Sequence, residues 1–240
     1  YFLDNTERKA AEKELAAQAA ALRAADRSKD EFLAMLAHEL RNPLAPLRNA
    51  TEVLRSASAP TEDRSRAQEI MVRQIGNLSR MIDDLLDVSR ITQGKIQLHR
   101  KPLVLQEVLA ATVAAAREPC LKNLQDLTFS QPEEPVFVDG DATRLEQVFG
   151  NLIGNACKYS GPGSGIWVKV ELGTDETVTV TVGDSGIGID PEVLPRIFGL
   201  FVQSSRTLVR SHGGLGIGLT IVNRLVRVHD GAMEGKSAGP

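Results

Sequence analysis

The chain has 240 residues, 42% of them hydrophobic and 25% charged, which is the composition of a globular protein with room for more than one domain. Its net charge is −3, so neither nucleic acid nor an anionic membrane surface is expected as a partner. The longest apolar run, residues 108–116, is far shorter than the roughly 20 residues that span a bilayer, and we expect no membrane contact from this segment. Cys120 and Cys157 lack the spacing of a metal site and are expected to be reduced and buried.

The chain begins with an alanine-rich, charged stretch that predicts a long helix. We expect no signal peptide, because residues 1–4 lead directly into charged residues. Leu15 and Leu22 lie seven residues apart, the spacing of a parallel coiled coil, although a solvated single helix also fits this sequence. We favour the coiled coil and interpret residues 1–27 as a linker that carries a signal into the next segment.

A histidine stands in an unusual setting in the helical sequence that follows. Apolar residues recur every three or four positions and predict one buried stripe, formed by Leu33, Leu36, Leu40, Leu44 and Leu47. His38 lies off this stripe and is expected to face solvent, beside the carboxylate of Glu39 and one turn before the amide of Asn42. Pro43 lacks a backbone N–H and is expected to bend or loosen the helix just after the histidine. A lone histidine is more often structural, but this arrangement suits a nucleophile that a large partner must reach.

A second helix is expected after a turn at residues 56–60. It starts near Thr61 and carries its own apolar stripe from Ile70 to Val88. Two antiparallel helices cannot bury both stripes by themselves, so the pattern predicts that two copies of the chain pair into a four-helix bundle. We therefore expect a homodimer formed through the helical hairpin.

The pattern changes after a break at residues 93–95, where we place a domain boundary. Helices are expected over residues 104–117 and 141–159, and strands over 127–130, 136–138, 166–172 and 178–182, the last two as a hairpin. Helices on one face of a mixed sheet make an α/β sandwich. The predicted fold is an all-α helical hairpin over residues 28–95, followed by an α/β sandwich over residues 101–240.

Polar residues share one face of the helix expected over residues 141–159. Asn151, Asn155 and Lys158 are spaced by four and then three residues, which places them on the same side. Amide oxygens are hard ligands that suit Mg2+, and an ammonium group suits phosphate. An ordinary polar surface is the simpler interpretation, but asparagine is unfavourable in mid-helix, so two of them favour a binding function. Asn155 is the predicted metal ligand.

Two glycine-rich segments follow. Asp184 comes directly after the last predicted strand, with Gly186 and Gly188 behind it. Its carboxylate can accept a hydrogen bond from an adenine amino group, and the glycines allow the backbone to approach closely. The second segment, residues 212–222, opens a helix with repeated glycines, where free N–H groups and the helix dipole favour a phosphate. It is not a Walker loop, because no Lys-Ser/Thr pair follows in the required place.

In this order, these segments resemble the motifs of bacterial sensor histidine kinases. Residues 28–44 are similar to the phospho-acceptor box, residues 144–159 to the N box, and residues 182–189 and 212–222 to the two glycine boxes. The last three motifs are shared with gyrase-type ATPases of the Bergerat fold, whereas the first separates a histidine kinase from them. Residues 1–9 also resemble the end of a PAS sensor domain.

The resemblance implies the cytoplasmic catalytic core of a histidine kinase, with ATP and Mg2+ as cofactors. His38 is implied as the phospho-acceptor, Glu39 as the general base and Asn42 as a residue that supports a phosphatase activity. The implied nucleotide-binding residues are Asn151, Asn155, Lys158, Tyr159, Asp184, Gly186, Gly188, Gly214, Gly216, Gly218 and Leu219. The phosphoryl group is then expected to pass to an aspartate in the receiver domain of a separate response regulator.

Two departures from the family pattern leave alternatives open. Gly199 stands where such kinases usually carry a glutamate, beside a lid over ATP that is expected over residues 198–213, although Phe198 and Phe201 are retained. The strand that normally closes the sheet is also missing after Gly239, so a less stable ATP domain is expected. A catalytically silent dimeric ATP-binding scaffold, or a Bergerat-fold ATPase, is therefore the alternative to a kinase.

Overall fold

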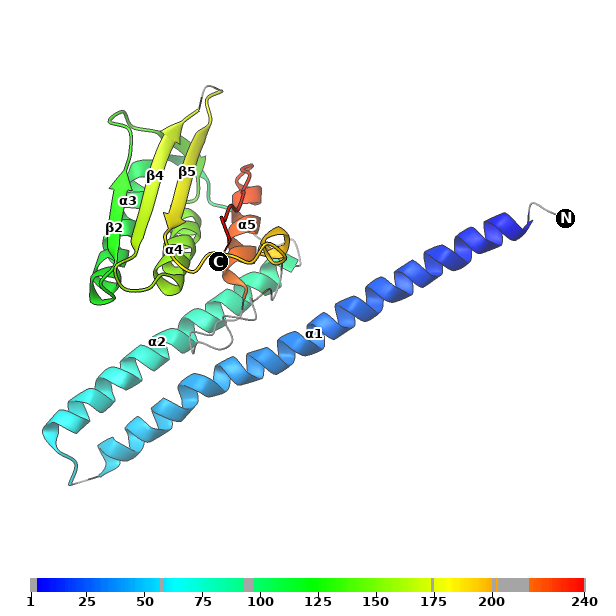
Figure 1. The fold of residues 1–240 in the computed structure, drawn as a ribbon. Helices are drawn as coiled ribbons and strands as arrows, with labels where there is room; N and C mark the ends of the chain where they lie inside the picture. The colour runs from blue at the N-terminus through cyan, green and yellow to red at the C-terminus, as the bar shows by residue number, and fades with distance from the viewer. Residues whose placement is uncertain are drawn as a thin grey trace. The chain divides into compact units, whose positions relative to one another are not determined.

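A computed structural model describes residues 4–56, 58–92, 97–173, 175–199, 202 and 216–239. The chain divides into two compact units, Tyr1–Arg80 and Met81–Pro240, whose helices and strands are labelled in Figure 1. Within the described residues, no helix combines the length and the apolar character that are needed to cross a membrane. The second helix continues across the division between the units, so the predicted boundary at residues 95–101 stays a prediction.

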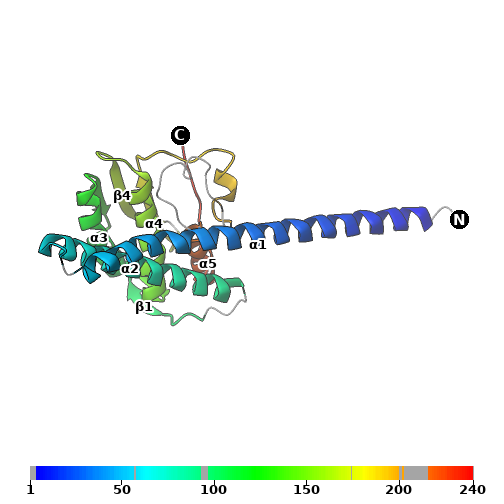
Figure 2. The same ribbon diagram turned by 90° about the horizontal axis from the view of Figure 1, so that it is seen from below.

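The first unit is a helical hairpin. α1 (Asp4–Arg55) and the first part of α2 (Thr61–Thr92) run antiparallel from the turn that joins them (Figures 1 and 2). Ala50 and Ala67 are buried near the turn, where small side chains let the two helices approach closely. Acidic residues in the first turn of α2 favour its start at Thr61, as predicted.

The prolines of α1 do not interrupt it. Pro43 and Pro46 both lie inside one continuous helix, so the expected loosening after His38 does not break the helix. Pro43 is buried, and apolar packing offsets the backbone hydrogen bond that its ring removes. The leucine stripe is less well covered: Leu33, Leu44 and Ile75 are each about half exposed in the single chain. A lone hairpin therefore leaves part of both stripes in water, as the pattern predicted.

The second unit contains two small sheets. β2 (Asp126–Ser130) pairs in parallel with β4 (Gly165–Leu172), which pairs antiparallel with β5 (Val178–Asp184), so this sheet is mixed, as predicted. β1 (Lys101–Val104) pairs antiparallel with β3 (Phe137–Gly140) in the other sheet. The sequence pattern missed β1, because its polar start and Pro102 do not alternate like a strand, and pairing with β3 creates it.

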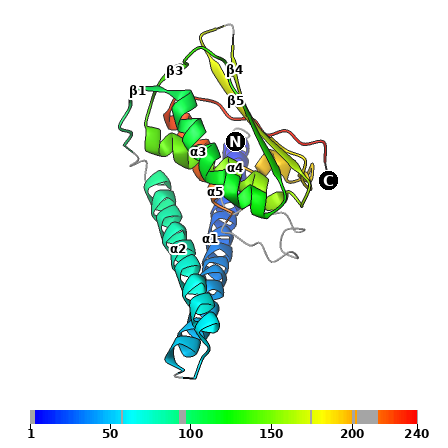
Figure 3. The same cartoon turned by 90° about the vertical axis from the view of Figure 1, so that its left-hand side faces the viewer.

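Three helices cover one face of the mixed sheet, as Figure 3 shows. They are α3 (Leu105–Lys122), α4 (Ala142–Tyr159) and α5 (Gly218–Val228), and a short 3-10 turn, η1 (Leu194–Arg196), precedes α5. Alternate residues of β4 point into the core beneath them, where Ile166 and Val168 are almost fully buried. Ile153 of α4 and Ile221 of α5 are completely buried in the same unit. The predicted α/β sandwich is confirmed.

The two cysteines lie close together at the base of this core. Both are free thiols; Cys120 is buried and Cys157 is half-buried, so the expected burial is complete only for Cys120. Burial, together with the neighbouring Cys120 thiol, raises the pKa of Cys157 to about 12. Its thiol is therefore protonated at neutral pH.

Candidate functional site

His38 lies on the exposed surface of α1, as predicted. The amide nitrogen Nδ2 of Asn42, one turn later, lies 3.4 Å from its ring nitrogen Nδ1. The tautomer decides the donor: the amide N–H donates to an unprotonated Nδ1, whereas a protonated Nδ1 donates to the amide oxygen once the amide has turned over. A neutral imidazole with its proton on Nδ1 leaves Nε2 unprotonated, and in this tautomer Nε2 is the ring nitrogen that is left for chemistry.

Within the described residues, Glu39 makes no hydrogen bond to this imidazole. Its side chain is half-buried, and within the described part of the chain it makes no hydrogen bond or ion pair. Consecutive residues of a helix do not face each other, which disfavours a hydrogen bond between Glu39 and His38. The role of Glu39 as a general base therefore stays a prediction.

The start of α4 is fixed by Asp141. Its Oδ1 accepts a hydrogen bond from the backbone N–H of Arg144 at 3.2 Å, and its Oδ2 accepts one from the backbone N–H of His99 at 3.0 Å. Burial by itself would raise the pKa of Asp141, but these donors outweigh it and hold the pKa below its usual value. The carboxylate is ionised at neutral pH and caps the helix that carries the predicted nucleotide-binding residues.

The last turn of α4 meets the first glycine segment. Oδ1 of Asp184, at the end of β5, accepts hydrogen bonds from the Ser160 hydroxyl at 3.2 Å and from the Gly186 N–H at 2.9 Å. The N–H of Ile187 donates to the carbonyl oxygen of Tyr159 at 3.2 Å. A Cβ on Gly186 would lie 2.4 Å from that same oxygen, so this close approach requires glycine. The structure thus brings Asp184, Gly186 and Tyr159 together.

The second glycine segment meets α4 two turns earlier. Gly218 begins α5, and a Cβ on it would lie 3.2 Å from Oδ1 of Asn151. Gly216, with a φ of 64°, has the left-handed backbone that favours glycine, and so has Gly188 in the first segment, with a φ of 67°. Leu219 is half-buried in the first turn of α5. The start of α5 therefore lies beside Asn151.

Asn155 and Lys158 lie on α4 between Asn151 and Tyr159. Both side chains are half-buried. The ammonium of Lys158 lies 5.0 Å from the centre of the Tyr159 ring, within the range of a cation–π interaction. The predicted nucleotide-binding residues therefore lie along α4. Asp184 and Gly186 are at its last turn, and Gly218 is beside Asn151.

Part of the predicted site lies outside the described residues, namely Gly214 and most of the expected lid, including Phe201. Gly199, near the start of the expected lid, is held through its backbone. The hydroxyl of Thr220 donates to the carbonyl oxygen of Gly199 at 2.7 Å, and the Gly199 N–H donates to the Arg196 carbonyl oxygen at 2.8 Å. Although position 199 has no carboxylate, it is anchored to α5.

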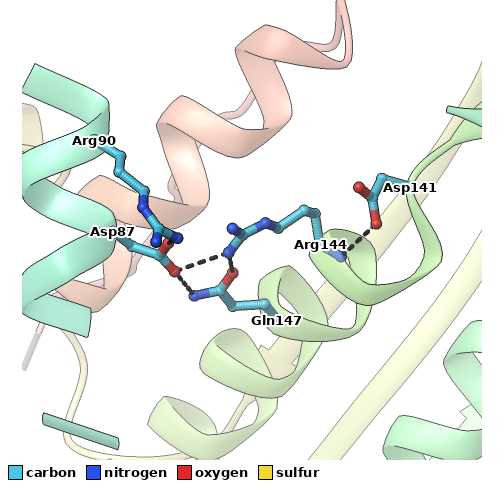
Figure 4. A network of polar contacts seen from close by, with 5 residues as sticks. All are labelled: Asp87, Arg90, Asp141, Arg144 and Gln147. Carbon is cyan, nitrogen blue, oxygen red and sulfur yellow. Dashed lines mark hydrogen bonds and ion pairs between the residues drawn. The ribbon is translucent and has the colours of Figure 1, made fainter. Parts of the chain in front are cut away.

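Sequence reasoning missed a polar network at the start of α4 (Figure 4). Oδ2 of Asp87, on α2, accepts hydrogen bonds from Nη1 of Arg144 at 2.9 Å and from Nε2 of Gln147 at 2.7 Å. Nη1 of Arg144 also donates to Oε1 of Gln147 at 2.8 Å, and Arg90 lies 4.0 Å from Oδ1 of Asp87. A signal was present, because Arg144 and Gln147 extend the polar face of Asn151 in steps of three and four residues.

Two family models match the chain. Residues 28–94 match the His Kinase A (phospho-acceptor) domain, and this range contains His38. Residues 140–238 match the histidine kinase-, DNA gyrase B- and HSP90-like ATPase, and this range contains α4 and both glycine segments. The two matches therefore cover both halves of the candidate site.

Individual proteins are similar over most of this chain. It is 33% identical over 243 residues to two-component system protein A of Emericella nidulans, covering 99% of this chain and 35% of that protein. It is 34% identical over 221 residues to the sensor histidine kinase TrcS of Mycobacterium tuberculosis, covering 86% and 41%. Among solved structures, full-length ShkA in complex with AMPPNP aligns with a TM-score of 0.61 and 25% identity, over 86% of this chain and 44% of that one. The chain spans less than half the length of these three proteins.

Proposed function

Since the chain belongs to the sensor histidine kinase family, we propose that it transfers the γ-phosphoryl group of ATP to His38 and then to an aspartate of a response regulator. The observation that supports this most directly is the convergence on α4. Both glycine segments meet this helix, one at Tyr159 and the other at Asn151. An exposed His38 on a separate helix supplies the acceptor.

The residues along α4 fit a nucleotide. The carboxylate of Asp184, held by Ser160 and Gly186, can accept a hydrogen bond from an adenine amino group. Gly186 lets the glycine turn approach the Tyr159 carbonyl oxygen closely, which keeps Asp184 beside the end of α4, and the backbone N–H groups at the start of α5 suit the phosphates. Lys158 adds a positive charge between these ends.

The amide oxygen of Asn155 would hold Mg2+ together with the phosphate oxygens of the substrate. Within the described residues, no cluster of three or more His, Cys, Asp or Glu side chains could hold a metal ion, which fits an ion that arrives with the nucleotide. Such an ion neutralises charge on the transferring phosphoryl group. Asn151, four residues earlier on the same face, is the second amide in reach.

The reaction at His38 needs one unprotonated ring nitrogen. In the tautomer that carries its proton on Nδ1, beside Asn42, Nε2 is unprotonated and attacks the γ-phosphorus. The N–P bond forms as the bond from the phosphorus to the bridging oxygen breaks, and ADP leaves with that electron pair. Glu39 would take a proton from Nδ1 after its side chain turns toward the imidazole, and it acts as the general base in this proposal.

Two partners follow from the same surfaces. The half-exposed apolar side chains of the hairpin, among them Leu33, Leu44 and Ile75, suit a second copy of the chain, which gives a homodimer. The exposed position of His38 lets the receiver domain of a response regulator approach with its aspartate. Neither step requires nucleic acid or a membrane.

Incubation of the chain with γ-labelled ATP and Mg2+ tests the proposal. We expect label on the protein that is labile in acid and stable in base, as a phosphoramidate is. Release of labelled phosphate without labelled protein would indicate an ATPase instead. Nucleotide binding with neither result would indicate the silent scaffold.

Two substitutions test the placement of the pocket. Asn155→Asp alters the proposed metal ligand, and Asp184→Asn removes a carboxylate acceptor from the proposed adenine site. We expect both to weaken the use of nucleotide, the first by impairing phosphoryl transfer and the second by lowering affinity for adenine nucleotides over guanine nucleotides. Unchanged affinity and turnover in both variants would place the pocket elsewhere.

A further inference from the structure

The polar face of α4 continues past the proposed nucleotide site toward the start of the helix. Asp184 and Gly186 contact its last turn at Tyr159 and Ser160, whereas Gly218 lies beside Asn151. Tyr159 and Asn151 are eight residues apart, about 12 Å along the helix axis. With adenine at Asp184 and the phosphates at the start of α5, a bound nucleotide would run along α4 toward its N-terminus.

Gln147 and Arg144 lie further along that direction. They precede Asn151 in the sequence by one and two turns, about 6 and 10 Å along the axis, on the same side of the helix. This is the end to which the terminal phosphate of a triphosphate would point. A guanidinium suits this position, because it carries a fixed charge and donates two parallel hydrogen bonds to phosphate oxygens.

In the structure this guanidinium is bound to a carboxylate (Figure 4). Arg144 and Gln147 both donate to Oδ2 of Asp87, at 2.9 and 2.7 Å. The Asp87 side chain is 8% exposed and that of Arg144 is 22% exposed, so water screens this pair little. A buried carboxylate with two donors holds them firmly, because losing them would leave an uncompensated charge.

On the basis of the proposed function, we propose that Asp87 is a counter-anion that holds Arg144 in place of the terminal phosphate of ATP. The γ-phosphate and the Asp87 carboxylate compete for the same guanidinium, and ADP, which is one phosphate shorter, does not enter this competition. ATP binding therefore breaks the Asp87–Arg144 ion pair between α2 and α4, whereas ADP binding leaves this ion pair intact. Because α2 is one helix from Thr61 to Thr92, this exchange connects the nucleotide state to the hairpin that carries His38.

Other contacts hold α4 and the end of α5 when the Asp87–Arg144 ion pair breaks. His99 donates its backbone N–H to Asp141 at 3.0 Å, and Arg100 forms an ion pair of 2.7 Å with Asp230, just after α5. These contacts involve neither Asp87 nor the side chain of Arg144. A variant that lacks the Asp87 charge is therefore expected to keep the fold of α4 and α5.

Competition gives a directional expectation. If the terminal phosphate must displace the Asp87 carboxylate from Arg144, the measured affinity for ATP is lower than it would be without Asp87. Asp87→Asn removes the charge and keeps the shape, so affinity for a triphosphate should rise by about tenfold, a typical coupling between two sites. Affinity for ADP should stay the same.

Calorimetric titration of the whole chain with Mg-AMPPNP and with Mg-ADP measures both quantities. Asp83→Asn is the matched control, because Asp83 is exposed on α2, one turn before Asp87, and loses the same charge. We expect Asp87→Asn alone to raise the preference for triphosphate over diphosphate. An equal effect of both substitutions, or an equal change for both nucleotides, would overturn the proposal.

Arg144→Gln provides a second measurement that does not depend on the folding of the first variant. It should bring the affinities for AMPPNP and ADP close to one another, and adding Asp87→Asn to it should change neither. A triphosphate preference that survives in Arg144→Gln would overturn the proposal while leaving the proposed nucleotide site intact. Failure of the parent chain to bind either nucleotide would instead contradict the proposed function itself.

Discussion

The surface around His38 and the proposed nucleotide pocket along α4 differ in how much the surrounding structure encloses them. The imidazole of His38 is exposed, and its Nδ1 lies 3.4 Å from the amide nitrogen of Asn42. The pocket joins a helix, a strand end and a glycine turn through short contacts, such as the 2.9 Å bond from Gly186 to Asp184. A phospho-acceptor histidine that must meet a whole protein domain has to be exposed. A small ligand, in contrast, binds best to a site whose residues are already in position.

This contrast predicts where substitutions act. A change at the open surface should remove one chemical step and leave the fold alone, because few contacts are lost. A change in the pocket should alter binding through packing, because a neighbouring backbone atom leaves no space.

The largest effect is expected at His38. His38→Ala removes the acceptor nitrogen and should abolish labelling by γ-labelled ATP, while nucleotide affinity stays close to that of the parent chain. His99→Ala is the matched control, since His99 contacts Asp141 only through its backbone N–H. Labelling of the His38 variant at the level of the parent would exclude this histidine as the acceptor.

The next effect is expected at Asn42. An amide one turn from the acceptor can hold a water in line with the phosphorus of a docked phospho-aspartate, and positioning of this kind is worth roughly 10²-fold or more. Asn42→Ala should keep autophosphorylation but lose dephosphorylation of the regulator. The exposed Asn49 on the same helix supplies the control, Asn49→Ala. If regulator phosphate decays equally fast with both variants, Asn42 is only a structural residue.

Gly186→Ala tests the pocket side of the comparison. The added Cβ would lie 2.4 Å from the Tyr159 carbonyl oxygen and 2.6 Å from Oδ1 of Asp184, so the turn must shift. Overpacking of this kind costs about 1–3 kcal/mol, and we expect nucleotide affinity to fall about 10- to 100-fold.

The control for this variant is Gly161→Ala, where an added Cβ meets nothing within 4 Å. Equilibrium binding of a fluorescent ADP analogue to both variants decides the question. Equal affinities would mean that the first glycine turn does not line the pocket.

The smallest effect is expected at Asp141, which supports the pocket from the far end of α4. Asp141→Asn keeps an oxygen for the Arg144 N–H but leaves the His99 N–H without its acceptor, so we expect the free energy of unfolding to fall by about 1 kcal/mol at pH 7. Asp139→Asn, at an exposed position of β3, is the control.

The pH dependence of this variant has a definite sign. Folding lowers the pKa of Asp141, so its carboxylate stabilises the fold above its unfolded pKa of about 4 and loses that contribution as the pH falls through the folded pKa. The difference between Asp141→Asn and the parent should therefore be constant from pH 7 down to about 5 and shrink below pH 4. Denaturant unfolding at several pH values measures it, and a difference that grows in acid would contradict the assignment.

Local patterns predicted most helices and strands of this chain. The starts of α2 and α4 and the hairpin of β4 and β5 lie close to where spacing and capping residues placed them. β1 was missed, since a polar four-residue strand exists only through its pairing with β3. The motif residues on α4 and in the first glycine segment could be proposed from the sequence because their spacing is short and each motif is local in the chain.

The sequence by itself determined which residues are proposed to carry chemistry, because helical spacing and glycine turns are local properties that neighbouring residues encode. Tertiary structure decided what those residues touch. Asp87 and Arg144 are 57 residues apart in the chain, and no spacing rule connects them. Their contact depends on how α2 and α4 pack, and the low exposure of Asp87 follows from that packing. A buried ion pair of this kind can be recognised only once the fold has removed both groups from water.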